Sequence, residues 1–95
     1  MAKLQLRVFT TENAAIDEPV SMVIVRCIAA EEGTALSDIG ILPNHAPCAA
    51  VLGPAESTLR IINDEDERQL QVYGGAVTVQ DNVVTVLTQR AKWVE

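Results

Sequence analysis

The sequence predicts an all-β protein, a two-layer antiparallel β-sandwich, and three observations lead to this expectation. Apolar and polar residues alternate with a period of two along much of the chain. Turn-forming residues separate these stretches at intervals of ~8–12 residues, a spacing typical of sandwiches. Helical signals are confined to residues 12–16 and 89–94, which could form turns but are too short for a stable helix.

The first expected strands lie in the amino-terminal third of the chain. In KLQLRVF, Leu4, Leu6 and Val8 fall on one face of a strand and the residues between them on the other. The run EPVSMVIVRCIAA is rich in β-branched residues, with Pro19 at a place where a strand can begin. A loop is expected over 31–37, where Gly33 stands among small polar residues.

Two hairpins are expected in the second half of the chain. Residues 58–62 form a strand, NDEDE a turn, and RQLQVY a second strand with Leu70 and Val72 inward. In GGAVTVQDNVVTVLTQ, Asp81 and Asn82 form a two-residue turn that accepts φ > 0. The register that follows puts valines on the buried side, in the pairs Gln80–Val83, Val79–Val84, Thr78–Thr85 and Val77–Val86.

Composition bounds the class of protein. The 95 residues suffice for one domain, and 48% hydrophobic residues with only 3% aromatics predict an aliphatic core. The net charge of -6 argues against a nucleic-acid surface, since phosphate binding needs clustered Lys and Arg. Cys27 and Cys48 are expected to be reduced core thiols. The start MAKLQL is not expected to be a signal peptide, and no apolar run reaches the ~18–20 residues that span a bilayer.

No catalytic residue is predicted. His45 is the only histidine, and its neighbours Asn44 and Ala46 offer no orienting carboxylate. Ser37 and Asp38 could suggest a triad with this histidine, but no nucleophile motif such as G-x-S-x-G surrounds the serine. A histidine in such a loop is more often a structural or partner-contact residue than a catalytic one.

No metal site, nucleotide site or cofactor is predicted either. The acidic stretch 64–67 lacks the glycine and the distal glutamate of a calcium loop, and it is more typical of a solvated turn. Gly74 and Gly75 precede no helix, so they favour a bulge or a close backbone contact over a phosphate loop. The segment IGILPNHAPCAAVL remains unusual, because Pro43 and Pro47 cannot lie inside a strand. Such a segment on an inert scaffold suggests binding.

Three stretches resemble one known family. GILPNHAP at 40–47 resembles the G-I-L-P-G-H-A-P core of the epsilon subunit of F-type ATP synthases. LQLRV at 4–8 resembles the opening strand of that family, and the Gly-Gly hairpin at 74–87 resembles its G-G-x-x-x-V-x-x-N-x-V-T-V-L ending. The resemblance covers essentially the whole chain and implies the amino-terminal β-sandwich of the family, in which about ten short strands are usual.

The resemblance also implies a function. It suggests a non-catalytic rotor subunit of the central stalk, which binds the γ subunit and the ring of c subunits and couples proton (or sodium) translocation to ATP synthesis. Its place would be peripheral, at the cytoplasmic face of the bacterial cell membrane, as part of the complex. The implied c-ring contact comprises Ser37, Asp38 and Ile39, and the implied γ contact comprises Thr10, His45 and Ala50.

Some positions depart from the family pattern. Leu36-Ser37-Asp38 replaces the usual E-G-E, the loop over 26–37 is longer than usual, and Asn44 replaces a glycine. Family members commonly continue into an α-helical hairpin that carries inhibition of ATP hydrolysis and, in some members, ATP binding. We expect 1–88 to be the sandwich domain and 89–95 a short tail, so neither activity is assigned to this chain.

Two other hypotheses stay open at this point. A β-sandwich adaptor or ligand-binding module of another family would have a deep apolar pocket and no affinity for γ. A small hydrolase would depend on His45, so its activity would be lost in His45→Ala. A sandwich fold alone does not choose among these functions.

Overall fold

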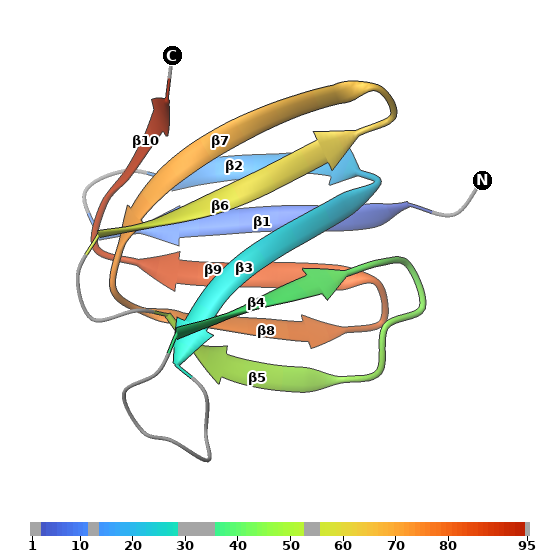
Figure 1. The fold of residues 1–95 in the computed structure, drawn as a ribbon, viewed down its shortest axis with the longest axis horizontal. Coiled ribbons are helices and arrows are strands. Elements are labelled where there is room, and N and C mark those ends of the chain that lie inside the picture. Colours follow the sequence, from blue (N-terminus) through green and yellow to red (C-terminus); the bar gives the residue numbers. More distant parts are fainter. Residues whose placement is uncertain (1–2, 12–13, 29–35, 53–55, 95) are drawn as a thin grey trace.

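The computed structural model describes residues 3–11, 14–28, 36–52 and 56–94. These residues form ten β-strands and two sheets of five (Figure 1). The strands are β1 (Leu4–Thr10), β2 (Ala14–Val20), β3 (Met22–Ile28), β4 (Leu36–Ile41), β5 (Cys48–Val51), β6 (Glu56–Asn63), β7 (Asp66–Tyr73), β8 (Ala76–Gln80), β9 (Val83–Thr88) and β10 (Ala91–Val94).

The two sheets face each other as layers (Figure 1). The first sheet has the order β2-β1-β9-β8-β5, and the second sheet has the order β10-β7-β6-β3-β4. Among the described strands, β1 and β9 run parallel to each other, and the other pairings are antiparallel. The predicted two-layer sandwich of about ten short strands is therefore confirmed, with one parallel contact inside it.

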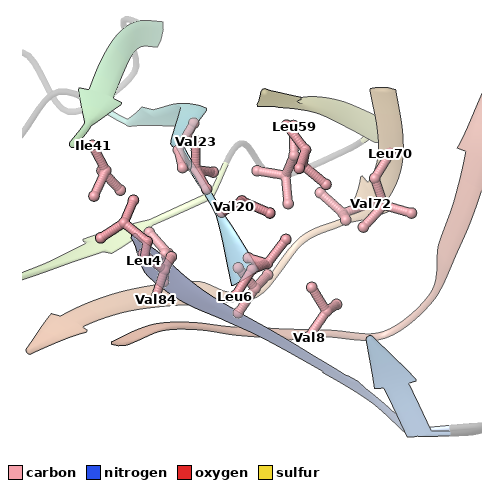
Figure 2. Packing of buried hydrophobic residues seen from close by; sticks show 14 of the residues in the cluster. Leu4, Leu6, Val8, Val20, Val23, Ile41, Leu59, Leu70, Val72 and Val84 are labelled. Atoms are coloured by element: carbon pink, nitrogen blue, oxygen red, sulfur yellow. The ribbon is translucent and has the colours of Figure 1, made fainter. Parts of the chain in front are cut away.

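The core lies between the sheets and is aliphatic, as the composition predicts. Leu4, Leu6 and Val8 alternate inward from β1 and are each at most 1% exposed. Figure 2 shows such side chains from both layers pointing into the shared interior. Leu70 and Val72 come from the second sheet, so the inward face expected for RQLQVY is also confirmed. Every buried methylene here contributes about 0.8 kcal/mol.

Two hairpin turns use residues that tolerate a positive φ. Asp81 and Asn82 have φ of 52° and 63°, the conformation that a two-residue hairpin turn requires. The strands β8 and β9 pair in the predicted register, from Gln80 opposite Val83 onwards. In the β6–β7 hairpin the turn lies at Asp64 and Glu65, and Asp64 has φ of 59°.

Gly75 marks a close approach of two backbones. It has φ of 111°, and a Cβ atom added to it would lie 1.8 Å from the carbonyl oxygen of Leu87. Its own carbonyl accepts a hydrogen bond from the Leu52 amide at 3.0 Å. The close contact expected for the adjacent glycines is thus confirmed at this residue, whereas Gly74 has open space around it.

One strand expectation is wrong at Pro19. The run EPVSMVIVRCIAA forms parts of two strands in different sheets, and Pro19 lies near the end of β2, not at the start of a strand. Ser21 makes the crossing, and its amide donates to the Ile62 carbonyl at 2.8 Å. Because β2 is an edge strand, it tolerates a residue without an N–H.

Other local expectations also change. Residues 14–16 and 91–94 are strands and not helical turns, and residues 12–13 lie outside the described part of the chain. Residues 26–28 belong to β3 and residues 36–37 belong to β4, so these parts of the expected loops are strands. The rest of the expected loops, residues 29–35, lies outside the described part of the chain. Cys48 is an exposed free thiol and not a core residue, since it lies on the edge strand β5.

An ion pair and a cation–π contact, both made by Arg68, hold the two sheets together at one edge of the sandwich. Arg68 of β7 forms an ion pair with Glu18 of β2, on the opposite sheet. The same guanidinium lies 4.5 Å from the ring centroid of Trp93 on β10. The indole also packs against the core, so this strand is joined to the sandwich by more than its backbone ladder.

Candidate functional site

The connection between β4 and β5 is built around a tight turn. The His45 amide donates to the Leu42 carbonyl at 3.1 Å, with Pro43 and Asn44 between them. Asn44 has φ of 68°, so the turn combines proline at its second position with a left-handed residue at its third, the pattern of a type II turn. Both prolines of the segment lie in this connection, outside the strands, as the sequence requires.

The recorded contacts of the His45 imidazole are with residues one and three positions further along the chain. Its Nδ1 donates to the Ala46 carbonyl at 2.8 Å, and Cys48 Sγ lies 4.0 Å from the same nitrogen. Neither partner is a carboxylate. Asp38 lies near the start of β4 and His45 beyond its end, so the geometry offers no triad with Ser37, whose side chain is outside the described part.

Asp38 is exposed on the outer face of the second sheet. Its carboxylate accepts a hydrogen bond from Arg26 Nε at 3.0 Å, across the β3–β4 pair. This hydrogen bond lowers the pKa of Asp38 below its ordinary value, with smaller electrostatic contributions from Arg26 and Arg60. Ile39 packs against the core. Among the three residues expected at the c-ring, Asp38 is therefore the one whose described side chain is exposed.

A shallow hollow of about 360 Å³ lies beside this ion pair. It is lined mainly by polar side chains of the second sheet, among them Arg26, Asp38 and Arg60. Arg60 is held in turn by Glu67, at 2.8 Å. Across the strands the two arginines lie between the two carboxylates, and the lining is more polar than that of a ligand pocket in an adaptor.

The residues expected to contact γ do not lie together. Thr10 pairs with Thr88, and Ala50 pairs with Val77, so both lie toward the Gly75 end of the first sheet. His45 lies at the opposite end, where its loop meets the β8–β9 turn. Figure 1 shows this separation between the arrowhead of β5 and the connection that precedes it.

Sequence reasoning missed an exposed apolar row on the outer face of the first sheet. Phe9 pairs with Leu87, Leu87 with Ala76, and Ala76 with Val51, so one row crosses β1, β9, β8 and β5. The exposed fractions are 38% for Phe9, 53% for Leu87 and 58% for Val51. The predicted hairpin register already places Ala76 opposite Leu87, but the parallel β1–β9 contact that adds Phe9 has no local signal.

Two further findings concern metal ligands and membrane-spanning helices among the described residues. In the described ranges, no group of three His, Cys, Asp or Glu residues could hold a metal ion. Among the same residues, none of the structure forms a helix long and apolar enough to cross a membrane.

Comparison with known proteins gives a consistent family. The β-sandwich domain of the ATP synthase delta/epsilon chain matches residues 3–94. The ATP synthase epsilon chain of Caldicellulosiruptor bescii is 32% identical over 95 residues, which are 100% of this chain and 63% of that protein. The epsilon chain of Bacillus subtilis is 34% identical, with 100% of this chain and 65% of that protein covered. The chain thus spans somewhat less than two thirds of these relatives.

Solved structures agree on the fold. A chain in the Euglena gracilis mitochondrial ATP synthase, a cryo-EM structure of OSCP/F1/c-ring, superposes with a TM-score of 0.80 at 23% identity, covering 98% of this chain and 54% of that one. A chain of the Tetrahymena thermophila mitochondrial ATP synthase central stalk/c-ring gives a TM-score of 0.69 at 16% identity, covering 96% and 66%. At these identities the likeness concerns the fold alone.

Proposed function

The chain belongs to the β-sandwich domain family of ATP synthase delta and epsilon chains, and from this premise we propose that it is a non-catalytic subunit of the central stalk of an F-type ATP synthase. In this role it binds the γ subunit and the c-ring, and it couples ion translocation to ATP synthesis as part of the rotor. Its membrane association is peripheral, at the cytoplasmic face of a bacterial membrane, and depends on the complex.

The observation that carries the binding role is the apolar row Phe9, Leu87, Ala76 and Val51, in which Ala76 is half-buried and the other three are exposed. A contiguous apolar strip on a small domain typically marks a protein interface. Thr10 and Ala50, two of the residues expected at γ, directly follow and precede members of this row in sequence. We therefore propose that the outer face of the first sheet meets γ. Thr10 ends the interior strand β1, and Ala50, on the edge strand β5, packs against the core, so both adjoin the row along the chain without contributing their side chains to it.

The proposed c-ring contact comprises Ser37, Asp38 and Ile39. The exposed Asp38 carboxylate, together with Arg26, offers charges of both signs to polar loops of the ring. Such complementarity fixes the register of a contact more than it raises affinity. This contact lies on the second sheet, so the two proposed partners meet opposite layers of the sandwich.

The experiment is co-expression with γ from the same organism, followed by size exclusion with mass determination. We expect a one-to-one complex. Leu87→Glu should weaken this complex at least tenfold, because it introduces an uncompensated charge into the apolar row. Thr58→Glu adds the same charge to the outer face of the second sheet and serves as the control.

A wild-type chain that stays monomeric and does not bind γ would contradict the rotor proposal and favour the adaptor hypothesis. Complex formation that tolerates Leu87→Glu would preserve the rotor role but refute the assignment of γ to this face. Leu87 is exposed and Thr58 is half-buried on the outer face of its sheet, so each change should alter stability by only about 0.5 kcal/mol, which thermal unfolding would verify.

A further inference from the structure

The turn at Leu42–His45 is attached to a distant part of the chain through one side chain. Asn82, in the β8–β9 turn, accepts a hydrogen bond on Oδ1 from the Asn44 amide at 2.6 Å. Because a backbone N–H can only donate, the oxygen of the side-chain amide must face it. Nδ2 of the same side chain lies 3.5 Å from Asn44 Oδ1.

Asn82 also makes two backbone contributions. Its φ of 63° completes the two-residue hairpin turn, and its carbonyl accepts from the Gln5 amide at 2.8 Å. One residue thereby connects the start of β1, the β8–β9 hairpin and the β4–β5 connection, three segments that are far apart in sequence. The first two connections depend on the backbone, whereas only the third depends on the side chain.

Residues 42–47 have no strand ladder to hold them. Their place on the sandwich is set by the ends of β4 and β5 and by this amide contact. The turn carries Leu42, which is 53% exposed, and His45, which is half-buried. A surface of this kind binds a partner with less loss of conformational entropy when its geometry is already formed.

We propose that Asn82 is a positioning residue: its side chain locks the Leu42–His45 turn to the β8–β9 hairpin, so that Leu42 and His45 meet γ in a preformed geometry. This inference rests on the proposed function, that the chain binds γ, and it extends that contact to the Leu42–His45 turn at the other end of the first sheet. Apparent affinity scales with the fraction of molecules whose binding surface is correctly formed. Loosening the turn therefore weakens γ binding by the ratio of the closed fractions in the wild type and the variant, which is smaller than the factor by which the opening constant rises.

The test compares three variants of the full chain. Asn82→Gly keeps the positive φ and the carbonyl contact to Gln5 but removes the acceptor for Asn44. Asn82→Asp restores an acceptor at the same position. Asp81→Gly is the matched control, because it makes the same kind of change at the neighbouring turn residue, whose φ is 52°.

Two readouts are needed, amide hydrogen exchange at Asn44 and the Kd for γ. In Asn82→Gly we expect exchange at Asn44 to accelerate roughly two- to tenfold, the factor that one modest hydrogen bond carries. The Kd should rise by the ratio of closed fractions calculated from the opening constants that exchange measures in the wild type and the variant. Asn82→Asp and Asp81→Gly should stay near the wild type in both.

Each contrary outcome has a distinct meaning. Unchanged exchange in Asn82→Gly would show that the side chain does not lock the turn. Faster exchange with a Kd that departs from the value calculated from the measured opening constants would show that the lock does not position a γ contact. Equal weakening by Asp81→Gly would assign the effect to hairpin stability. A wild-type chain without affinity for γ would overturn the proposed function and the γ role of the lock together, while the exchange data would still report on the lock.

Discussion

Adding one methyl group at Gly75 should destabilise the protein far more than the same change at its neighbour. At Gly75 the new Cβ would lie 1.8 Å from the Leu87 carbonyl oxygen and 3.0 Å from the Thr88 Cα. These are backbone atoms of β9, so a side-chain rotation cannot relieve the overlap. The strands must separate, or the φ of 111° must change.

The expected cost combines two contributions. An L-residue held at such a φ carries about 1–3 kcal/mol of strain. Separating the backbones also weakens one or two nearby hydrogen bonds, including the 3.0 Å bond from the Leu52 amide to the Gly75 carbonyl, at about 1 kcal/mol each. Gly75→Ala should therefore lower the free energy of unfolding by about 2–5 kcal/mol, a large part of the roughly 5–14 kcal/mol of a domain of this size.

Gly74→Ala is the matched control. Gly74 has φ of 65° and nothing within 4 Å of an added Cβ, so only the left-handed conformation is penalised, by about 1–2 kcal/mol. Urea denaturation of both variants, with circular dichroism to confirm the folded baseline, measures the difference. Equal costs at the two glycines would refute the argument that the close approach to β9, and not the φ angle alone, demands a glycine.

Three further predictions follow from the structure. The Asp38 carboxyl should have a pKa below the ordinary range of an aspartate, and in Arg26→Ala its pKa should return toward that range, as measured by NMR titration. Because the pKa is lowered in the folded state, the stabilisation from this pair is present above the unfolded-state pKa and is lost as the pH falls through the folded-state pKa. Leu6→Ala should cost about 2–5 kcal/mol in chemical denaturation, since the side chain is fully buried between the sheets. Asn44→Gly should leave the thermal midpoint within a few degrees of the wild type, because glycine keeps both the left-handed φ and the amide donor, and a large drop would show that the asparagine side chain itself holds the turn.

The parts of the fold that were predictable from sequence are those with short-range causes. The β8–β9 register follows from Asp81 and Asn82, because a two-residue turn with positive φ leaves one pairing in which all the valines face inward. The inward faces of β1 and β7 follow from their alternation alone. Pro19 was misplaced for a related reason: a β-branched run does not reveal that the chain changes sheets at Ser21, since that crossing depends on a bond to the distant Ile62.

The candidate site was less predictable, because its surfaces depend on long-range pairing. The apolar row requires Phe9 beside Leu87, and this contact between β1 and β9 leaves no trace in either segment. The family resemblance identified His45, Thr10 and Ala50 as individual positions in the sequence. Only the strand order shows that they lie at both ends of the first sheet. The pairing of Asp38 with Arg26 likewise needed the β3–β4 register.

The parallel contact between β1 and β9 has a consequence for biosynthesis. Among the ten described strands β1 is synthesised first, and β9, one of its two neighbours in the sheet, is synthesised ninth. Until then, β1 can pair only with β2, and a two-stranded hairpin is at best marginally stable in water. We expect the first sheet to close only after β9 has been synthesised, so that this domain reaches its binding-competent form late and as a whole.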